Sequence, residues 1–243
     1  MNEQTLEKMK RMKLFGMHRS FRNVLESSAM NNLTSDELLS QLIENEWEDR
    51  HHRAVERNLR NARFRYKASV EMIDYTSNRG LDQNQLHRLA DCTFIKQNQN
   101  IIITGSTGTG KSFLASAIGH QACLLNFKVY YSNTLRLLAQ LKMAKADASA
   151  FKELAHLEKQ DLLILDDFGI QPFDHQSRML LMEIIEDRHG KHSTIIAGQV
   201  PLSAWYDIIG DETIADAILD RIVHDAHVIE LKGESLRRKR NVD

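Results

Sequence analysis

The chain has 243 residues, and its 32 lysines and arginines against 33 aspartates and glutamates give a formal net charge of -1. A hydrophobic content of 42% and a charged content of 27% are close to globular averages and exclude wholesale disorder. The two distant cysteines, Cys92 and Cys123, exclude a disulfide scaffold and a zinc ribbon, and no apolar run is as long as a membrane span. We therefore expect a cytoplasmic protein without a membrane-spanning segment.

The first 75 residues have the hydrophobic spacing of helices. Residues 5–29 carry apolar side chains at intervals of three to five, and Gly16 is a candidate interruption of this helix. Thr34 or Ser35 is placed to cap a second helix, which runs into a basic segment over residues 50–67. The cations of the basic segment, which face only Glu56, are Arg50, Arg53, Arg57, Arg60, Arg63, Arg65 and Lys67. Such a row suits a nucleic-acid backbone, and it is equally typical of a solvated helix face.

From about residue 76 the pattern changes to short apolar runs that alternate with helical stretches. The expected strands cover residues 101–103, 129–131, 162–165, 195–197 and 228–229. The expected helices cover residues 82–90, 111–125, 135–146 and 176–188, with one more from Pro201 and a last one from its cap Asp211 to residue 223. This alternation predicts an α/β fold with a five-stranded parallel sheet between helices. We expect a helical N-terminal domain over residues 1–75 and the α/β domain over residues 76–243.

The strongest motif lies between the first expected strand and the helix that follows it. Its residues are Gly105, Ser106, Thr107, Gly108, Thr109, Gly110, Lys111 and Ser112, a full match to GxxxxGK[ST]. Glycines allow backbone N–H groups to curl round phosphates, and the helix N-terminus adds a positive dipole end. Lys111 is expected to reach the β- and γ-phosphates of ATP, and Ser112 to coordinate Mg²⁺. The alternative is an ordinary glycine-rich turn.

A second motif is the apolar strand over residues 162–165, which ends in Asp166 and Asp167. Phosphoryl-transfer sites need a carboxylate at the carboxyl end of a strand to hold Mg²⁺, and Asp166 fits that role. Asp167 is placed to polarise the attacking water as a general base. Taken alone, two aspartates after a strand are often a solvated turn, but downstream of a phosphate loop they predict an ATPase site.

The two motifs, with Phe168 and Gly169 that follow, resemble those of AAA+ ATPases of the helicase-loader branch. Further segments narrow the resemblance to IstB-like ATP-binding proteins, the helper ATPases of insertion-sequence transposons. These segments are residues 12–17, 62–64, 195–205, 211–221 and 229–237. The resemblance covers nearly the whole chain, and it implies a P-loop AAA+ core preceded by helices, with ATP and Mg²⁺ as ligands.

The resemblance also implies roles for Gln199 and Arg221. Gln199 follows the fourth strand, where AAA+ proteins carry a sensor-1 residue, usually Asn, that orients water and the γ-phosphate. Arg221 lies where the family carries an arginine finger that reaches a neighbouring subunit's nucleotide. The alternative for Arg221 is a surface cation paired with Asp220 or Asp225. Because Asp167 is one methylene shorter than the usual Glu, slow hydrolysis is expected.

After the last expected strand only residues 231–243 remain, too few for the helical lid of most AAA+ proteins. We therefore expect no lid and no sensor-2 arginine carried on one. Arg237 is a candidate substitute for that arginine, but a basic tail over residues 237–240 is also typical of a solvated or phosphate-contacting end.

The resemblance implies an ATP-dependent homo-oligomer, a ring or helical assembly with nucleotide at its subunit interfaces, that binds duplex DNA and assists a transposase. Binding is expected to be largely independent of sequence and sensitive to salt. Lys142 and Lys145 are further candidate DNA contacts. The main alternative is a replicative helicase loader resembling DnaC, with single strands as the favoured nucleic acid. A third is a nucleotide-independent adaptor in which the N-terminal helices carry the function.

Overall fold

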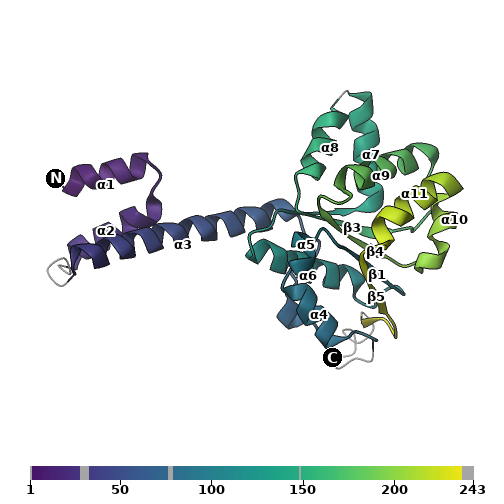
Figure 1. Ribbon diagram of the computed structural model, residues 1–243, viewed down its shortest axis with the longest axis horizontal. Coiled ribbons are helices and arrows are strands. Elements are labelled where there is room, and N and C mark those ends of the chain that lie inside the picture. Colours follow the sequence, from purple (N-terminus) through teal and green to yellow (C-terminus); the bar gives the residue numbers. More distant parts are fainter. Residues whose placement is uncertain (1, 28–32, 76–78, 148, 237–243) are drawn as a thin grey trace. The chain divides into compact units, whose positions relative to one another are not determined.

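The computed structural model (Figure 1) describes residues 2–27, 33–75, 79–147 and 149–236. The chain divides into two compact units, Met1–Arg57 and Asn58–Asp243. The division falls at residue 57 and not at the expected residue 75, because Ala62, Ala68 and Ile73 are buried in the core of the second unit. Among the described residues, none of the helices has both the length and the apolar character that crossing a membrane requires.

The first unit is helical and contains α1 (Asn2–Arg11), α2 (Phe15–Glu26) and most of α3 (Ser35–Ala62). The expected first helix is interrupted at Lys13, whose φ is 60°, so the prediction of Gly16 as the interruption was wrong. Gly16 instead lies inside α2, where a Cβ would come within 2.2 Å of the carbonyl oxygen of Asn45. This glycine therefore allows α2 and α3 to approach closely.

The start of α3 is capped as the sequence predicts. Thr34 Oγ1 accepts a hydrogen bond from the backbone N–H of Glu37 at 3.3 Å, and the Glu37 carboxylate accepts one from the N–H of Thr34 at 2.8 Å. This reciprocal pair satisfies backbone donors that the first helical turn leaves unpaired. Thr34 is thus the cap of the two residues proposed for that position.

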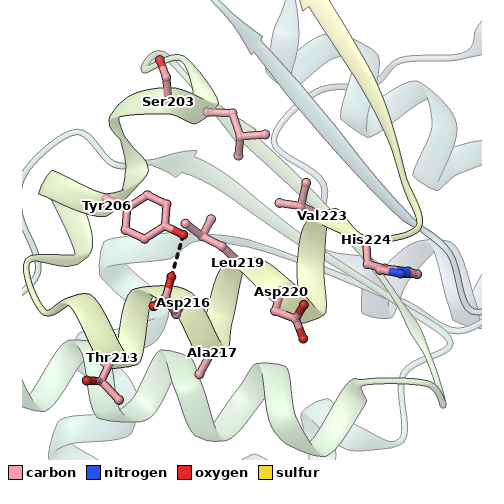
Figure 2. A pocket seen from close by; sticks show the side chains of 10 residues that line it. Ser203, Tyr206, Thr213, Asp216, Ala217, Leu219, Asp220, Val223 and His224 are labelled. Carbon is pink, nitrogen blue, oxygen red and sulfur yellow. Dashed lines mark hydrogen bonds between the residues drawn. The ribbon is translucent and has the colours of Figure 1, made fainter.

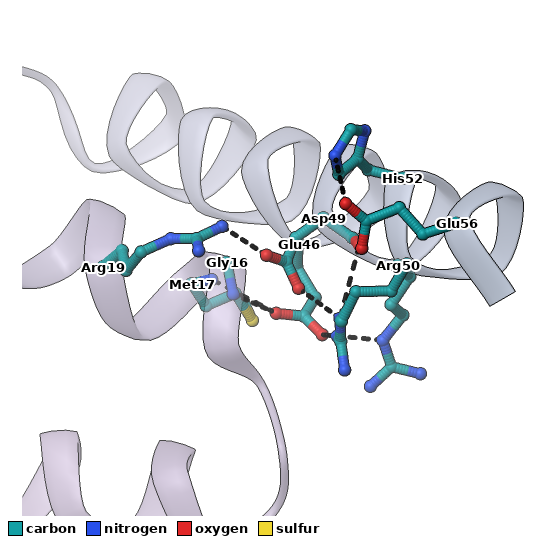
Figure 3. A network of polar contacts seen from close by, with 9 residues as sticks. Gly16, Met17, Arg19, Glu46, Asp49, Arg50, His52 and Glu56 are labelled. Carbon is teal, nitrogen blue, oxygen red and sulfur yellow. Dashed lines mark hydrogen bonds and ion pairs between the residues drawn. The ribbon is translucent and has the colours of Figure 1, made fainter. Parts of the chain in front are cut away.

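A nearly buried carboxylate on α3, that of Glu46, holds the start of α2 (Figure 3). It accepts the backbone N–H of Gly16 at 2.8 Å and that of the next residue at 3.2 Å. A negative charge is favoured there by the unpaired N–H groups and the dipole of α2. Arg50 Nε donates to the same carboxylate at 2.6 Å, and Arg53 pairs with Asp49 at 2.7 Å. Two cations of the basic segment therefore have acidic partners on their own helix.

The second unit is built on a parallel sheet of five strands in the order β2-β3-β4-β1-β5 (Figure 1). The strands are β1 (Asn100–Gly105), β2 (Val129–Asn133), β3 (Leu162–Phe168), β4 (Ser193–Gly198) and β5 (Ala226–Leu231). Each strand contains the apolar run predicted for it, so the α/β fold is confirmed. Only β4 separates β1 from β3, which brings the phosphate loop and the acidic pair to nearby points on the carboxyl edge of the sheet.

Helices cover both faces of the sheet, because successive strand residues point to opposite sides. Ile101 and Ile103 belong to one core and Ile102 to the other. The first core is filled from α4 (Gln83–Ala90), α5 (Thr93–Lys96) and α6 (Lys111–Leu124). The second is filled from α7 (Thr134–Ala146), α8 (Ala150–Glu158), α9 (His175–Arg188), α10 (Trp205–Ile209) and α11 (Glu212–Val223). The short helices α5 and α8 were not expected, and the helix expected at Pro201 begins as a 3-10 turn, η3 (Leu202–Ala204).

Candidate nucleotide-binding site

The phosphate loop, residues 105–112, joins β1 to α6 at the carboxyl edge of the sheet. Gly105, Gly108 and Gly110 have φ angles of 146°, 86° and 99°, which L side chains rarely adopt. A Cβ on Gly105 would also lie 2.2 Å from the carbonyl oxygen of Leu231 in β5. The glycines of the motif are therefore required by the shape of the loop.

Two side chains bind the loop from within. Lys111 Nζ donates a hydrogen bond to the carbonyl oxygen of Ser106 at 2.8 Å, and the hydroxyl of Thr109 donates to the same oxygen at 2.8 Å. The ammonium group thus lies inside the curve of the loop, where the phosphates of a nucleotide would meet it. This geometry fits a phosphate cradle.

The two predicted magnesium ligands meet beside the loop. The hydroxyl of Ser112 donates to Asp166 Oδ1 at 2.9 Å, and the Asp166 side chain is almost fully buried. Tyr131 OH donates to the other carboxylate oxygen, and burial together with this hydrogen bond raises the pKa of Tyr131, which keeps it a donor. A hydroxyl and a carboxylate oxygen are hard donors that suit Mg²⁺, which keeps several waters and binds substrate phosphates. The residues present therefore fit this ion.

Asp167 has an unusual backbone conformation. Its φ is 56°, and the pairing of β3 with β4 shifts register between Leu165 and Phe168. The left-handed conformation turns the Asp167 carboxylate away from the regular direction of the strand. There Asp167 Oδ2 accepts hydrogen bonds from Asn133 Nδ2 at 2.9 Å and from Arg65 Nη1 at 3.1 Å.

Neither Asn133 nor Arg65 was expected in the site. Asn133 ends β2 and is paired in register with Asp166 on β3, so the sheet brings it there. Its signal in the sequence was a polar residue two positions after the apolar run over residues 129–131. Arg65 lies 102 positions before Asp167, and no motif marks it. It was grouped instead with the cations of the basic segment.

Gln199 lies at the phosphate loop, as the sensor-1 assignment requires. It follows β4, the strand between β1 and β3, and its Oε1 accepts a hydrogen bond from the hydroxyl of Thr107 at 2.7 Å. The structure therefore brings together the loop, Asp166, Asp167 and Gln199.

Arg221 lies at the amino edge of the sheet, opposite the carboxyl edge that carries the phosphate loop. Its carbonyl oxygen accepts a hydrogen bond from Asn100, the first residue of β1, at 3.3 Å. Its guanidinium pairs with Glu186 of α9 at 2.5 Å and donates to the carbonyl oxygen of Ala217 at 2.8 Å. Glu186 is its partner, and neither Asp220 nor Asp225 is paired with it. Arg221 is therefore far from the phosphate loop of its own chain.

Two further segments lie on the phosphate loop. Arg79, which is 7% exposed, donates to the carbonyl oxygen of Thr109 at 3.2 Å. After β5, the N–H of Leu236 donates to the carbonyl oxygen of Gly108 at 3.0 Å. The phosphate loop is thus bordered by a residue that precedes the first strand in the sequence and by one that follows the last strand. Arg237 and the rest of the chain after it, where the expected absence of a lid would be decided, lie outside the described residues.

The other predicted DNA contacts have acidic partners. Lys142 pairs with Asp174 at 2.6 Å and Lys145 with Glu183 at 3.2 Å. The hydrogen bond from Lys142, together with one from the backbone N–H of Ser177, lowers the pKa of Asp174 to about 2. In the described part of the chain, Arg57 and Arg60 of the basic segment make no ion pair.

A separate hollow of about 930 Å³ lies along α11 and η3 (Figure 2). Its lining includes Leu202, Leu219 and Val223, and the Tyr206 hydroxyl donates to Asp216 at 2.7 Å at its edge. The lining contains none of the residues predicted for the nucleotide site. The hollow therefore adds nothing to that site.

A glycine-rich loop after a central parallel strand, joined through Ser112 to an acidic strand end, defines a P-loop nucleotide-binding protein. The model of the family described as IstB-like ATP binding protein matches residues 7–243. The chain belongs to that family.

Individual relatives agree with this assignment. An insertion sequence ATP-binding protein of Sinorhizobium fredii is 44% identical over 234 residues, which cover 96% of each chain. The insertion sequence IS21 ATP-binding protein of Pseudomonas aeruginosa is 31% identical and is matched over 95% of this chain and 87% of its own. The solved structure of the DnaC helicase loader has a TM-score of 0.56 at 22% identity and covers 69% of this chain and 98% of its own. That structural likeness shows the AAA+ fold.

Proposed function

We propose that this protein hydrolyses ATP slowly at a site completed by subunit assembly, binds duplex DNA largely independently of sequence, and assists a transposase. One observation carries the ATPase part: the hydroxyl of Ser112 and the carboxylate of Asp166, 54 positions apart, meet at 2.9 Å beside the phosphate loop. The names of the relatives, which are ATP-binding proteins of insertion sequences, support transposition as the setting and a transposase as the partner.

Each residue of the site acts on a different part of the reaction. Backbone N–H groups of the loop and Lys111 bind the phosphates. Ser112 and Asp166 would hold Mg²⁺, which would supply neutralisation of the phosphate charge. Asp167 accepts a proton from water, whose oxygen bonds to the γ-phosphorus as the bond to the departing ADP oxygen breaks. Gln199 orients this water, and the products are ADP and phosphate.

Hydrolysis depends on assembly in this proposal, because Arg221 lies at the opposite edge of the sheet from its own phosphate loop. The guanidinium would enter the site of a neighbouring subunit and neutralise charge that develops in the transition state. Its ion pair with Glu186 has to open first. This requirement supports a turnover that is slow until subunits meet.

The end of α7 and the start of α8 form the proposed contact with duplex DNA. Met143 on α7 and Phe151 on α8 are 69% and 85% exposed. Lys145 and Lys152, also exposed, add positive charge beside them. The exposure of large apolar side chains to water is unfavourable. Such side chains beside cations suit a partner that has a charged backbone and apolar surface. Arg57 and Arg60 of the basic segment offer a second surface for the phosphates.

Binding to random-sequence duplex and to single-stranded DNA, each with ATP, ADP or no nucleotide at one fixed salt concentration, tests this function. We expect cooperative duplex binding that requires ATP and is lost in Lys111→Ala. Phe151→Ala, at the start of α8, should weaken the binding. Phe127→Ala is unsuitable as a control, because Phe127 packs against the core. Tyr206→Phe on the surface of α10 is the matched control and should bind as the wild type does.

A preference for single strands would favour the helicase-loader alternative and contradict the duplex assignment. Binding that ignores the nucleotide would contradict the ATP-dependent part of the proposal.

A further inference from the structure

A short segment after α3 lies against the acidic side of the nucleotide site. We call residues 63–66 the strap. It begins where α3 ends, at Arg63, whose φ of 58° is incompatible with a continued helix. The Arg63 guanidinium lies 5.9 Å from the centre of the Tyr130 ring on β2. The first strap residue is thus held against the strand that neighbours β3.

Two aromatic residues anchor the strap. Phe64 meets the ring of Tyr131 edge-on, with 6.3 Å between ring centres, and Tyr131 OH donates to Asp166. A Cβ on Gly119 of α6 would lie 2.7 Å from the Phe64 ring, so Phe64 fills the space that this glycine leaves. Tyr66 lies 6.5 Å from Phe113, ring centre to ring centre. Because both neighbours of Arg65 are packed, the backbone at Arg65 is held in place.

Arg65 is the strap residue that faces the carboxylates. Its Nη1 lies 3.1 Å from Asp167 Oδ2 and 3.7 Å from Asp166 Oδ2. The guanidinium also lies 5.5 Å from the centre of the Tyr66 ring, which supports it from one side. A single cation is therefore shared between the proposed general base and the proposed magnesium ligand.

We propose that Arg65 is a positioning residue that restrains hydrolysis by holding the Asp167 carboxylate in an ion pair; this inference rests on the proposed ATPase function. Asp167 Oδ2 accepts hydrogen bonds from Arg65 and Asn133 together, which leaves this oxygen no free lone pair for the attacking water. The positive charge beside Asp166 also opposes the approach of Mg²⁺. Arg65 thus has to leave the carboxylates before Asp167 Oδ2 can accept a hydrogen bond from that water.

The opposite role for an arginine at this place is stabilisation of the transition state. An arginine that neutralises phosphate charge speeds hydrolysis, and its removal slows the reaction by large factors. Removal of a restraining arginine instead speeds hydrolysis. The direction of change on removing Arg65 therefore separates the two roles.

Arg65→Gln tests the inference through two readouts. The first is ATP turnover without DNA, and the second is the Mg²⁺ concentration that gives half-maximal binding of fluorescent mant-ATP. Since the Arg65 side chain is 46% exposed, we expect a turnover gain of about fivefold, the size typical of a partly exposed ion pair, and a lower Mg²⁺ midpoint. Arg65→Lys should retain part of the restraint. Thermal melting checks that each variant is folded.

Arg88→Gln on α4 is the matched control. Arg88 is exposed and pairs with no acidic side chain in the described part of the chain, so its removal should leave both readouts unchanged. In a double variant, adding Arg65→Gln to Asp167→Asn should give no gain in ATP turnover, because the restrained carboxylate is already absent.

Reduced turnover or an unchanged Mg²⁺ midpoint in Arg65→Gln would overturn the restraint and leave the ATPase proposal standing. A wild-type protein that neither binds mant-ATP nor hydrolyses ATP would overturn the proposed function and, with it, this inference.

Discussion

Asp167 combines a left-handed backbone with a carboxylate that two donors hold. A non-glycine residue in this conformation is disfavoured by roughly 1–2 kcal/mol, and Asp is among the residues that tolerate it best. The unfavourable conformation falls at the proposed general base and sets the direction of its carboxylate. Asn133 and Arg65 hold it there.

Single-residue assignments were predictable where chemistry and spacing agree. The proximity of Ser112 and Asp166 follows from a loop and a strand end that can be recognised separately, and the structure joins them at 2.9 Å. The two partners proposed for Arg221 were wrong, because Asp220 is adjacent to it on α11 and Asp225 lies beyond the end of that helix at Val223. Its partner Glu186 comes from another helix, α9, and only the packing of α9 against α11 brings the two together. Arg65 was missed for the same reason.

The two cysteines give a prediction at this scale. Both are fully buried, and burial raises the pKa of Cys92 and of Cys123 to about 12. Because the thiolate is the reactive form, both should react with iodoacetamide at pH 8 at least about 100-fold more slowly than a free thiol. Intact-mass measurements over time would follow the reaction. Full labelling in guanidinium chloride is the control, and rapid labelling of the native protein would contradict the burial.

At the scale of elements, hydrophobic periodicity predicted every strand and most helices of the second unit. The exceptions are short or weakly patterned. Four residues, as in α5 (Thr93–Lys96), are too few for a helical period to be visible, and α8 (Ala150–Glu158) buries only Leu154 and Leu157. The order of the strands in the sheet could not be predicted, because no local sequence pattern indicates which strands pair with each other.

The contact between α2 and α3 gives a prediction about Gly16. In an isolated helix Ala is more stable than Gly by about 1 kcal/mol, but here a Cβ would clash with the backbone of Asn45. Gly16→Ala should therefore destabilise the packing by about 1–3 kcal/mol. Hydrogen exchange of the α2 amides should become roughly tenfold faster.

Asn23→Ala, on the exposed side of the same helix, is the control and should leave exchange nearly unchanged. Equal exchange rates in the two variants would contradict the close approach of α2 to α3.

At the scale of the whole molecule, the proposed function divides the ATPase site into two parts that lie at opposite edges of the sheet of the second unit. The phosphate loop and acidic pair lie at the carboxyl edge, and Arg221 lies beside Asn100 at the amino edge. A chain with two complementary surfaces of this kind associates head to tail, which gives a ring if the rotation closes and a helix if it does not. The account therefore depends on sites that are shared between subunits.

Mixing two inactive variants tests this claim most directly. Lys111→Ala removes phosphate binding but keeps Arg221, and Arg221→Ala does the reverse. Each alone should lack assembly-dependent ATP turnover, whereas an equal mixture should regain it at about a quarter of its interfaces, where an intact loop meets an intact arginine. Full turnover by Arg221→Ala alone, or none in the mixture, would contradict a site shared between subunits.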